Sequence, residues 1–124
     1  MADSSSEKIV IFATHGGEDA EKATLPFVIG SAALAMDVPV TMILQTTGVT
    51  LAQKGSYEHI FAAGFDPLEK LAGSFLEFGG KILVCTPCTE ARRITQDMLI
   101  EGVELAKAGR MVQEVLEAKA VLNY

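Results

Sequence analysis

The sequence of 124 residues contains no tryptophan, only two tyrosines and six phenylalanines, and no basic run longer than the pair Arg92-Arg93. Its 16 acidic residues outnumber the 10 basic ones, which gives a net charge of −6 with both histidines neutral. Proteins that bind nucleic acid or anionic membranes need basic patches, and base stacking needs exposed aromatic rings. The composition therefore argues against a nucleic-acid-binding protein.

Long hydrophobic runs are also missing. The longest candidate, residues 25–36, is interrupted by Pro26, Gly30 and Ser31, and it is shorter than the roughly 18 apolar residues of a membrane span. The first residues are polar and acidic and lack the apolar core of a signal peptide. We expect no membrane span and a cytoplasmic location.

Cysteine is scarce, since the chain has only Cys85 and Cys88. A reducing compartment argues against a permanent disulfide between them. Hydrophobic residues make up 49% of the chain and charged residues 21%, which excludes a disordered protein. A chain of this length folds around one core without a metal or disulfide. We expect a disordered polar tail over residues 1–7, one domain over residues 8–124, and no cofactor or metal.

Short β-branched runs alternate with segments of helix-forming residues. Pro26 is expected to kink or break the first helix, and Asp66-Pro67 and Thr86-Pro87 each resemble an N-cap followed by a first helical residue. Residues 48–65 fit no regular element well. This alternation predicts a three-layer α/β/α fold with a mainly parallel sheet of about five strands. The predicted strands are 8–14, 38–44, 81–85, 102–104 and 120–124, and the predicted helices are 18–35, 66–78, 88–93 and 106–118.

Three polar groups follow predicted strands. His15 and Gly16 follow the first strand, residues 46–48 follow the second and residues 85–88 follow the third. Ligands of parallel sheets bind beyond the carboxyl ends of the strands, so we expect His15, Gly16 and Thr47 to line a binding site. The Gly16-Gly17 turn before a helix suits a small anion, but no P-loop or dinucleotide fingerprint accompanies it.

The CxxC motif formed by Cys85 and Cys88 is compatible with several chemistries. A zinc ribbon needs a second ligand pair, and only His15 and His59 remain. Thioredoxins also place Cys-x-Pro-Cys at a helix start, but this motif follows about two βα units and no proline follows Pro87. Both cysteines also fit the role of small buried hydrophobic residues. These alternatives stand beside a reactive thiol.

The position of Cys85 favours reactivity. A thiol at a strand end faces the backbone N–H groups of the following helix, and Arg92 or Arg93 adds positive charge. These interactions stabilise the thiolate, so the sequence predicts a lowered pKa for Cys85 and faster alkylation than at Cys88. Thr86 and Arg92 are expected to line the same site.

Three segments carry a resemblance to a known family: Ala13-Thr-His-Gly16, Val49-Thr-Leu-Ala-Gln-Lys-Gly55, and Lys81-Ile-Leu-Val-Cys85 followed by Ala91-Arg92. From Ile9 to Tyr124 the sequence resembles the DsrE/DsrF-like proteins. In their sulfur-relay members a cysteine at the end of a strand, before an arginine-rich turn, carries sulfur as a persulfide. The resemblance implies this role for Cys85. Cys88 is an additional cysteine found in some relatives, and it either acts catalytically by resolving the persulfide, forming a disulfide and releasing sulfide, or is a bystander.

The resemblance further implies a sulfur carrier or sulfurtransferase with protein donors and acceptors, assembled as a homo-oligomer, a trimer or hexamer. Arg93 stands where the family often has glycine. We expect segment 49–65, with Leu51, Ile60, Phe61 and Phe65, at the subunit interface because its apolar residues lack a core period. Two alternatives remain: an oligomeric module that binds a small ligand or partner with incidental cysteines, and a CxxC thiol–disulfide redox protein.

Overall fold

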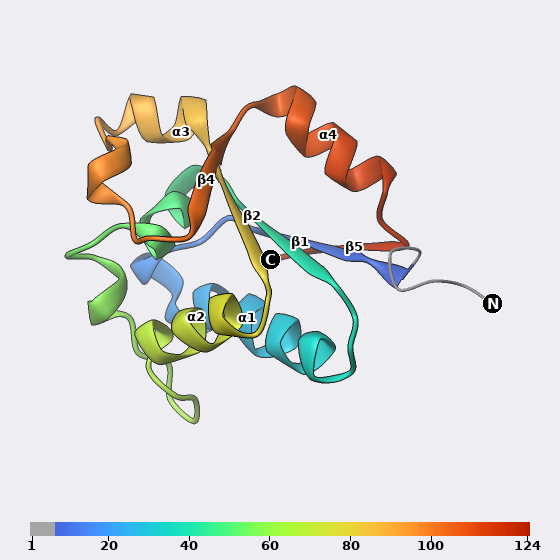
Figure 1. Cartoon of the computed structure of the whole chain (residues 1–124). Coiled ribbons are helices and arrows are strands. Elements are labelled where there is room, and N and C mark those ends of the chain that lie inside the picture. The colour runs from blue at the N-terminus through green and yellow to red at the C-terminus, as the bar shows by residue number, and fades with distance from the viewer. Residues whose placement is uncertain (1–6) are drawn as a thin grey trace.

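The computed structural model describes residues 7–124 and contains one five-stranded sheet (Figure 1). The predicted tail lies outside the described residues except for Glu7. All strand pairs are parallel, and the strand order is β4-β3-β2-β1-β5. The predicted α/β class is confirmed. The strands are β1 (Ile9–Ala13), β2 (Val40–Leu44), β3 (Lys81–Cys85), β4 (Val103–Ala106) and β5 (Ala120–Asn123).

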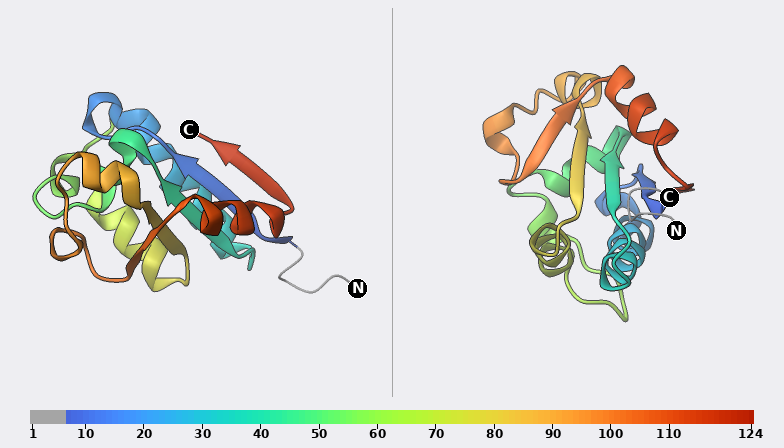
Figure 2. Two further views of the ribbon diagram at one scale, coloured as in Figure 1. Left: turned by 90° about the horizontal axis from the view of Figure 1, so that it is seen from above. Right: turned by 45° about the vertical axis from the view of Figure 1, so that its right-hand side comes forward.

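Helices cover both faces of the sheet, as the two views of Figure 2 show. Helices α1 (Ala20–Ala35) and α2 (Leu68–Glu77) lie on one face, and α4 (Ala108–Leu116) lies on the other. Right-handed crossovers explain this, because the chain moves outward from β1 to β4 and then returns past β1 to β5. The shorter helices are α3 (Thr86–Ala91), η2 (Gly17–Asp19), η3 (Thr46–Ala52), η4 (Tyr57–His59) and η5 (Gln96–Met98).

The core forms because the central strands are apolar on both faces. All five residues of β2 are buried, as a strand between two helical layers requires. On the face covered by α1 and α2, Phe27 meets Phe75 edge to face, with ring centroids 5.8 Å apart and planes at 88°. No helix within residues 7–124 is long and apolar enough to span a bilayer.

The structure excludes one alternative for Pro26 and corrects the predicted cap of a second helix. Helix α1 continues through Pro26, which is buried, so the alternative of a break is excluded; burial of the helix against the sheet outweighs the lost backbone hydrogen bond. Helix α2 begins at Leu68 with Pro67 as its N-cap, and the Asp66 side chain makes no capping hydrogen bond. Asp66 instead pairs with Lys70 at 3.6 Å.

The irregular segment 49–65 is packed more tightly than its sequence indicates. Val49, Leu51 and Ile60 are at most 4% exposed and belong to the core. Only Phe61, which is 62% exposed, and Phe65, which is 39% exposed, present large apolar side chains to the surface. The expectation that Leu51 and Ile60 pack against a neighbouring subunit is therefore wrong, because both side chains are buried in the core of their own chain. Phe61 and Phe65 remain available to a neighbour.

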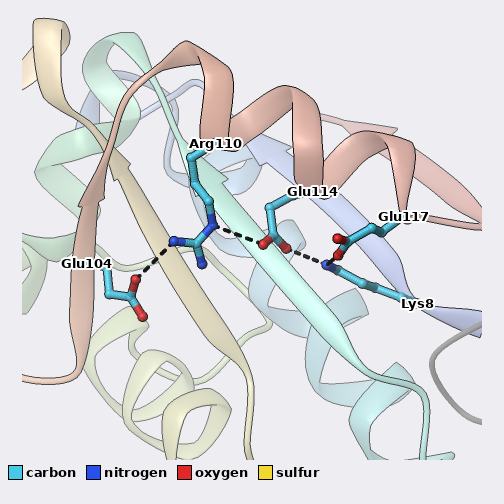
Figure 3. Close-up of polar contacts among 5 residues, drawn as sticks. All are labelled: Lys8, Glu104, Arg110, Glu114 and Glu117. Carbon is cyan, nitrogen blue, oxygen red and sulfur yellow. Dashed lines mark hydrogen bonds and ion pairs between the residues drawn. The ribbon is translucent and has the colours of Figure 1, made fainter.

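Ion pairs attach α4 to the sheet (Figure 3). The carboxylate of Glu114 is buried and accepts hydrogen bonds from Lys8 Nζ and, at 3.1 Å, from Arg110 Nε. Lys8 also contacts Glu117 at 3.2 Å, and Arg110 contacts Glu104 of β4 at 3.4 Å. The chain of charges joins α4 to the residue before β1 and to β4.

The pKa of Glu114 reflects two opposing influences. Burial raises it, but hydrogen bonds from Lys8, Arg110 and Thr41 outweigh burial and lower it to about 2. Glu114 is thus ionised at every physiological pH.

Candidate dithiol site

Cys85 and Cys88 lie at the carboxyl end of β3. Cys85 is the last residue of β3 and the N-cap of α3, and it pairs with Ala106 of β4. The cap therefore lies one residue earlier than predicted, because Thr86 and Pro87 are already helical. Cys85 is buried, with 7% of its surface exposed, whereas Cys88 is half-buried, and both thiols are free.

The predicted lowering of the Cys85 pKa is wrong. Burial is the largest influence and raises the pKa, and interaction with the Cys88 thiol raises it further. The backbone N–H of Cys88 and the more distant Arg92 lower it by less. Helix α3 has only six residues, and the Arg92 guanidinium donates instead to the carbonyl oxygen of Cys88 at 3.1 Å. Desolvation therefore decides the protonation state of Cys85.

Cys88 has a hydrogen-bond donor of its own. The backbone N–H of Thr46, which follows β2, donates to Cys88 Sγ at 3.3 Å. Thr46 has a φ of 53°, which a β-branched residue rarely adopts. Its hydroxyl lies 2.6 Å from the carbonyl oxygen of Thr14 and 2.7 Å from that of Gln45, and it donates its hydrogen to them. These contacts hold the Thr46 backbone against its intrinsic preference.

A glycine lets the loop after β2 approach the end of β1. A Cβ atom at Gly48 would lie 2.1 Å from the carbonyl oxygen of Ala13, so no other residue fits without a shift. The Gly48 N–H donates to Gln45 at 2.8 Å. The loop that carries Thr46 is therefore held against the ends of β1 and β2.

Of the residues predicted beside the cysteines, His15, Gly16 and Thr47 lie at neighbouring strand ends. The ring of His15 contacts the hydroxyl of Thr14, with 3.2 Å between Nδ1 and Oγ1, and makes no hydrogen bond to either cysteine among the described residues. The N–H of Gly16, which we expected to meet an anion, donates to the carboxylate of Glu18 at 2.7 Å. The chain's own carboxylate thus uses this donor.

Thr47 and Thr86 act through their backbones. The carbonyl oxygen of Thr47 accepts from the Thr50 hydroxyl at 2.7 Å, and that of Thr86 accepts from the Thr89 hydroxyl at 2.8 Å. The sequence predicted Thr47 as a site residue, but in the structure the adjacent Thr46 contacts Cys88 Sγ. The sequence indicates that Thr46 and Thr47 follow a strand. It does not indicate the left-handed backbone of Thr46 that turns its N–H toward Cys88.

The surface grooves lie apart from the thiols. One groove, of about 370 Å³, lies between the carboxyl-terminal ends of α1 and α2, at the opposite end of the strands from the cysteines. Another, of about 260 Å³, runs along α4 and is lined by apolar residues and Gln45. Within residues 7–124 no group of three or more His, Cys, Asp or Glu side chains is placed to hold a metal ion.

A parallel five-stranded sheet with helices on both faces places the chain in the class of small three-layer α/β proteins. The chain belongs to the DsrE/DsrF-like family, whose model matches residues 7–124. The earlier resemblance is thereby confirmed over nearly the whole chain.

Two curated proteins are similar to this chain in sequence. The chain is 35% identical over 102 residues to the uncharacterized protein MJ0760 of Methanocaldococcus jannaschii, covering 82% of this chain but only 37% of that protein. It is 30% identical over 116 residues to the uncharacterized protein MK0008 of Methanopyrus kandleri, covering 94% of this chain and 91% of the relative. This chain therefore spans little more than a third of the first relative's length.

Solved structures share the fold. The ychN protein of E. coli superposes with a TM-score of 0.81 at 22% identity, over 95% of this chain and 99% of that one. The protein MTH1491 of Methanobacterium thermoautotrophicum superposes with a TM-score of 0.72 at 18% identity, over 95% and 99% of the two chains. At these identities the likeness establishes the fold.

Proposed function

We propose that this protein is a sulfur-relay protein that carries sulfane sulfur as a persulfide on Cys85 and passes it to an acceptor thiol. The observation that carries the proposal is the pair of free thiols at the carboxyl end of β3 in a DsrE/DsrF-like fold. Cys85 occupies the strand-end position that holds the persulfide in the sulfur-relay members of the family. The donor and acceptor are proteins that present a persulfide and a thiol, respectively.

The chemistry needs no cofactor. A sulfane sulfur leaves a donor persulfide R–S–SH when a thiolate attacks its outer sulfur, so the donor S–S bond breaks and R–S⁻ departs. The protein then holds the sulfur as Cys85–S–SH. Attack of an acceptor thiolate on the outer sulfur returns the Cys85 thiolate and gives the acceptor persulfide. Burial of Cys85 supports the carrier role, because it limits access of solution thiols to the stored sulfur.

A persulfide-loading experiment tests this function. The protein is treated with a small persulfide donor, desalted, exposed briefly to glutathione, and weighed by mass spectrometry. We expect a gain of about 32 Da that survives glutathione and is removed by dithiothreitol, as one sulfur atom on a cysteine requires. Cys88→Ser should retain this gain, and Cys85→Ser should lose it in glutathione because only the more exposed Cys88 remains.

Two results would contradict the proposal. One is the absence of any 32 Da gain in the folded wild-type protein. The other is an equally glutathione-resistant gain in Cys85→Ser, which would remove Cys85 as the carrier.

Interaction between the two thiols also favours a second candidate function, thiol–disulfide exchange. That function predicts instead a mass about 2 Da lower after mild oxidation and no sulfur uptake.

The proposal extends to assembly and location. We propose a homo-oligomer, most simply a trimer, in the cytoplasm, where a reducing environment keeps both thiols available. Exposed Phe61 and Phe65 support an interface near segment 49–65.

A further inference from the structure

The two thiols of the site have opposite environments. Cys85 is 7% exposed and the carboxyl end of β3 buries it, whereas Cys88 is half-buried on the first turn of α3. Among residues 7–124, only Cys88 of the two accepts a hydrogen bond from another element, from Thr46 N–H at 3.3 Å. This contact holds the Cys88 sulfur at the ends of β2 and β3, where it is more exposed than Cys85. Cys88 therefore differs from Cys85 both in its exposure to solvent and in its hydrogen bond from another element.

Thr46 is held in place for this contact. Its left-handed backbone is unfavourable for a β-branched residue, and its hydroxyl contacts the carbonyl oxygens of Thr14 and Gln45 at 2.6 and 2.7 Å. The hydroxyl thus joins the ends of β1 and β2 and fixes the direction of the Thr46 N–H. Without the hydroxyl, the residue is expected to relax and to turn its N–H away from Cys88.

We infer that Cys88 is the thiolate that first receives sulfur, that Thr46 is its positioning residue, and that the sulfur then moves to buried Cys85. This inference rests on the proposed function. In the first step the Cys88 thiolate attacks the outer sulfur of a donor persulfide R–S–SH, giving Cys88–S–SH and R–S⁻. In the second step Cys85 attacks the outer sulfur of Cys88–S–SH. The products are Cys85–S–SH and Cys88–SH, and the Cys85 proton ends on the Cys88 sulfur, so no oxidant is consumed.

Alkylation measures the first part of this inference. The native protein is treated with iodoacetamide at pH 7.5, and labelling of each cysteine is followed separately in Cys85→Ser and Cys88→Ser. We expect Cys88 to react at least about tenfold faster than Cys85, since Cys88 is more exposed and burial raises the pKa of Cys85. Equal rates, or faster labelling of Cys85, would overturn the assignment.

Variants of Thr46 test its positioning role in the Cys85→Ser background. Thr46→Val keeps the branched shape but removes the hydroxyl, and it should slow alkylation of Cys88 about tenfold. Thr46→Ser restores the hydroxyl and should recover the parent rate. Thr50→Val, which removes a hydroxyl bonded to Thr47 in the same loop, is the matched control and should leave the rate unchanged. Unchanged labelling in a folded Thr46→Val, or equal slowing by Thr50→Val, would refute the role.

The order of transfer is tested by the rate of loading with the small persulfide donor. Cys88→Ser should gain 32 Da at least tenfold more slowly than wild type, because the remaining Cys85 is buried. It should reach the same end point, because Cys85 still holds the sulfur. Loading of Cys88→Ser at the wild-type rate would overturn the order while leaving Cys85 as carrier. Loss of glutathione-resistant sulfur from wild type would instead refute the proposed function, so the two failures are distinguishable.

Discussion

Arg93 adopts a backbone conformation that glycine prefers. Its φ is 55°, and it follows α3 in a turn closed by hydrogen bonds from Arg93 N to Glu90 O at 3.1 Å and from Ile94 N to Thr89 O at 2.9 Å. This is the Schellman pattern, in which the left-handed residue is usually glycine. Helix α2 ends in the same pattern with Gly79 at a φ of 96°. The turn behind the cysteines therefore forms with arginine in a conformation that favours glycine, at an energetic cost.

We predict that Arg93→Gly stabilises the protein. The substitution removes left-handed strain of a side-chain-bearing residue but adds backbone entropy to the unfolded chain, for a net gain of about 1 kcal/mol. The free energy of unfolding from urea titration measures it. A loss of stability would show that the Arg93 side chain makes a compensating contribution.

Asp37 is the matched control for this prediction. It occupies the same position after α1, with a φ of 62°, and the bonds Asp37 N to Leu34 O and Val38 N to Ala33 O repeat the pattern. Aspartate tolerates this conformation better than arginine because its short side chain bonds locally. Asp37→Gly should therefore gain less than Arg93→Gly, and an equal or larger gain would contradict the explanation by side-chain type.

At the residue scale the sequence located the thiols but not their environments. The strand ending at Cys85 and the proline that follows it were enough to place both cysteines at the carboxyl edge of the sheet. The pKa direction of Cys85 was not predictable, because it depends on burial by β2, β4 and the loop after β2, which are distant in sequence. The contact between Thr46 and Cys88 likewise needs a left-handed threonine, which no local pattern indicates.

At the scale of elements, ion pairs centred on the buried carboxylate of Glu114 join α4 to the sheet. The pKa of Glu114 falls from 4.5 to about 2 in the folded protein, so its ionised form stabilises the fold above pH 4.5. That contribution, about 3 kcal/mol, is lost progressively as the pH falls from about 5 through 2. We predict that Glu114→Gln lowers stability at pH 7 and flattens its decline over this acidic range, as followed by urea unfolding at several pH values.

Glu117→Gln is the control for this network. Glu117 also contacts Lys8, but its side chain is 55% exposed, so solvent screens the pair. The variant should change stability at pH 7 by less than about 0.5 kcal/mol and retain the acid dependence. If the two variants behave alike, the depressed pKa of Glu114 does not govern the acid response.

The sequence predicted the identity of nearly every element because β-branched runs and helix formers alternate clearly. The residues at which helices begin and end were harder to predict. Pro67 and Thr86-Pro87 gave caps displaced by one residue, since proline fits both the cap and the first turn. Pro26 left a choice between a kink and a break, and only the break is excluded, because burial of a long helix outweighs the loss of one hydrogen bond. The buried Glu114 was not predictable, as its partner Lys8 is distant in the sequence.

At the scale of the whole molecule, exposed apolar side chains form separate patches. Phe61 and Phe65 lie in the loop before α2, Met36 and Phe78 lie after α1 and α2, and Leu116 ends α4. Phe61 is 62% exposed, Phe78 71% and Leu116 80%. Such surfaces mark contacts when they are contiguous. Aspartate substitutions that introduce a charge into each patch separately can identify which one a neighbouring subunit covers.

We predict that the protein is a homo-oligomer and that Phe61 lies at its interface, because this ring projects from a segment otherwise anchored in the core by Leu51 and Ile60. Because buried residues hold this segment in place, little loop entropy is lost when Phe61 is buried on association.

Light scattering at micromolar concentration should give a multiple of 13.2 kDa. Phe61→Asp should shift the mass toward the monomer, because it buries an unpaired charge, whereas Phe78→Asp, at the opposite end of the strands, should not. A monomeric wild type would refute assembly itself. An unchanged mass in folded Phe61→Asp would remove the segment from the interface, and dissociation by Phe78→Asp alone would move the interface to the ends of α1 and α2.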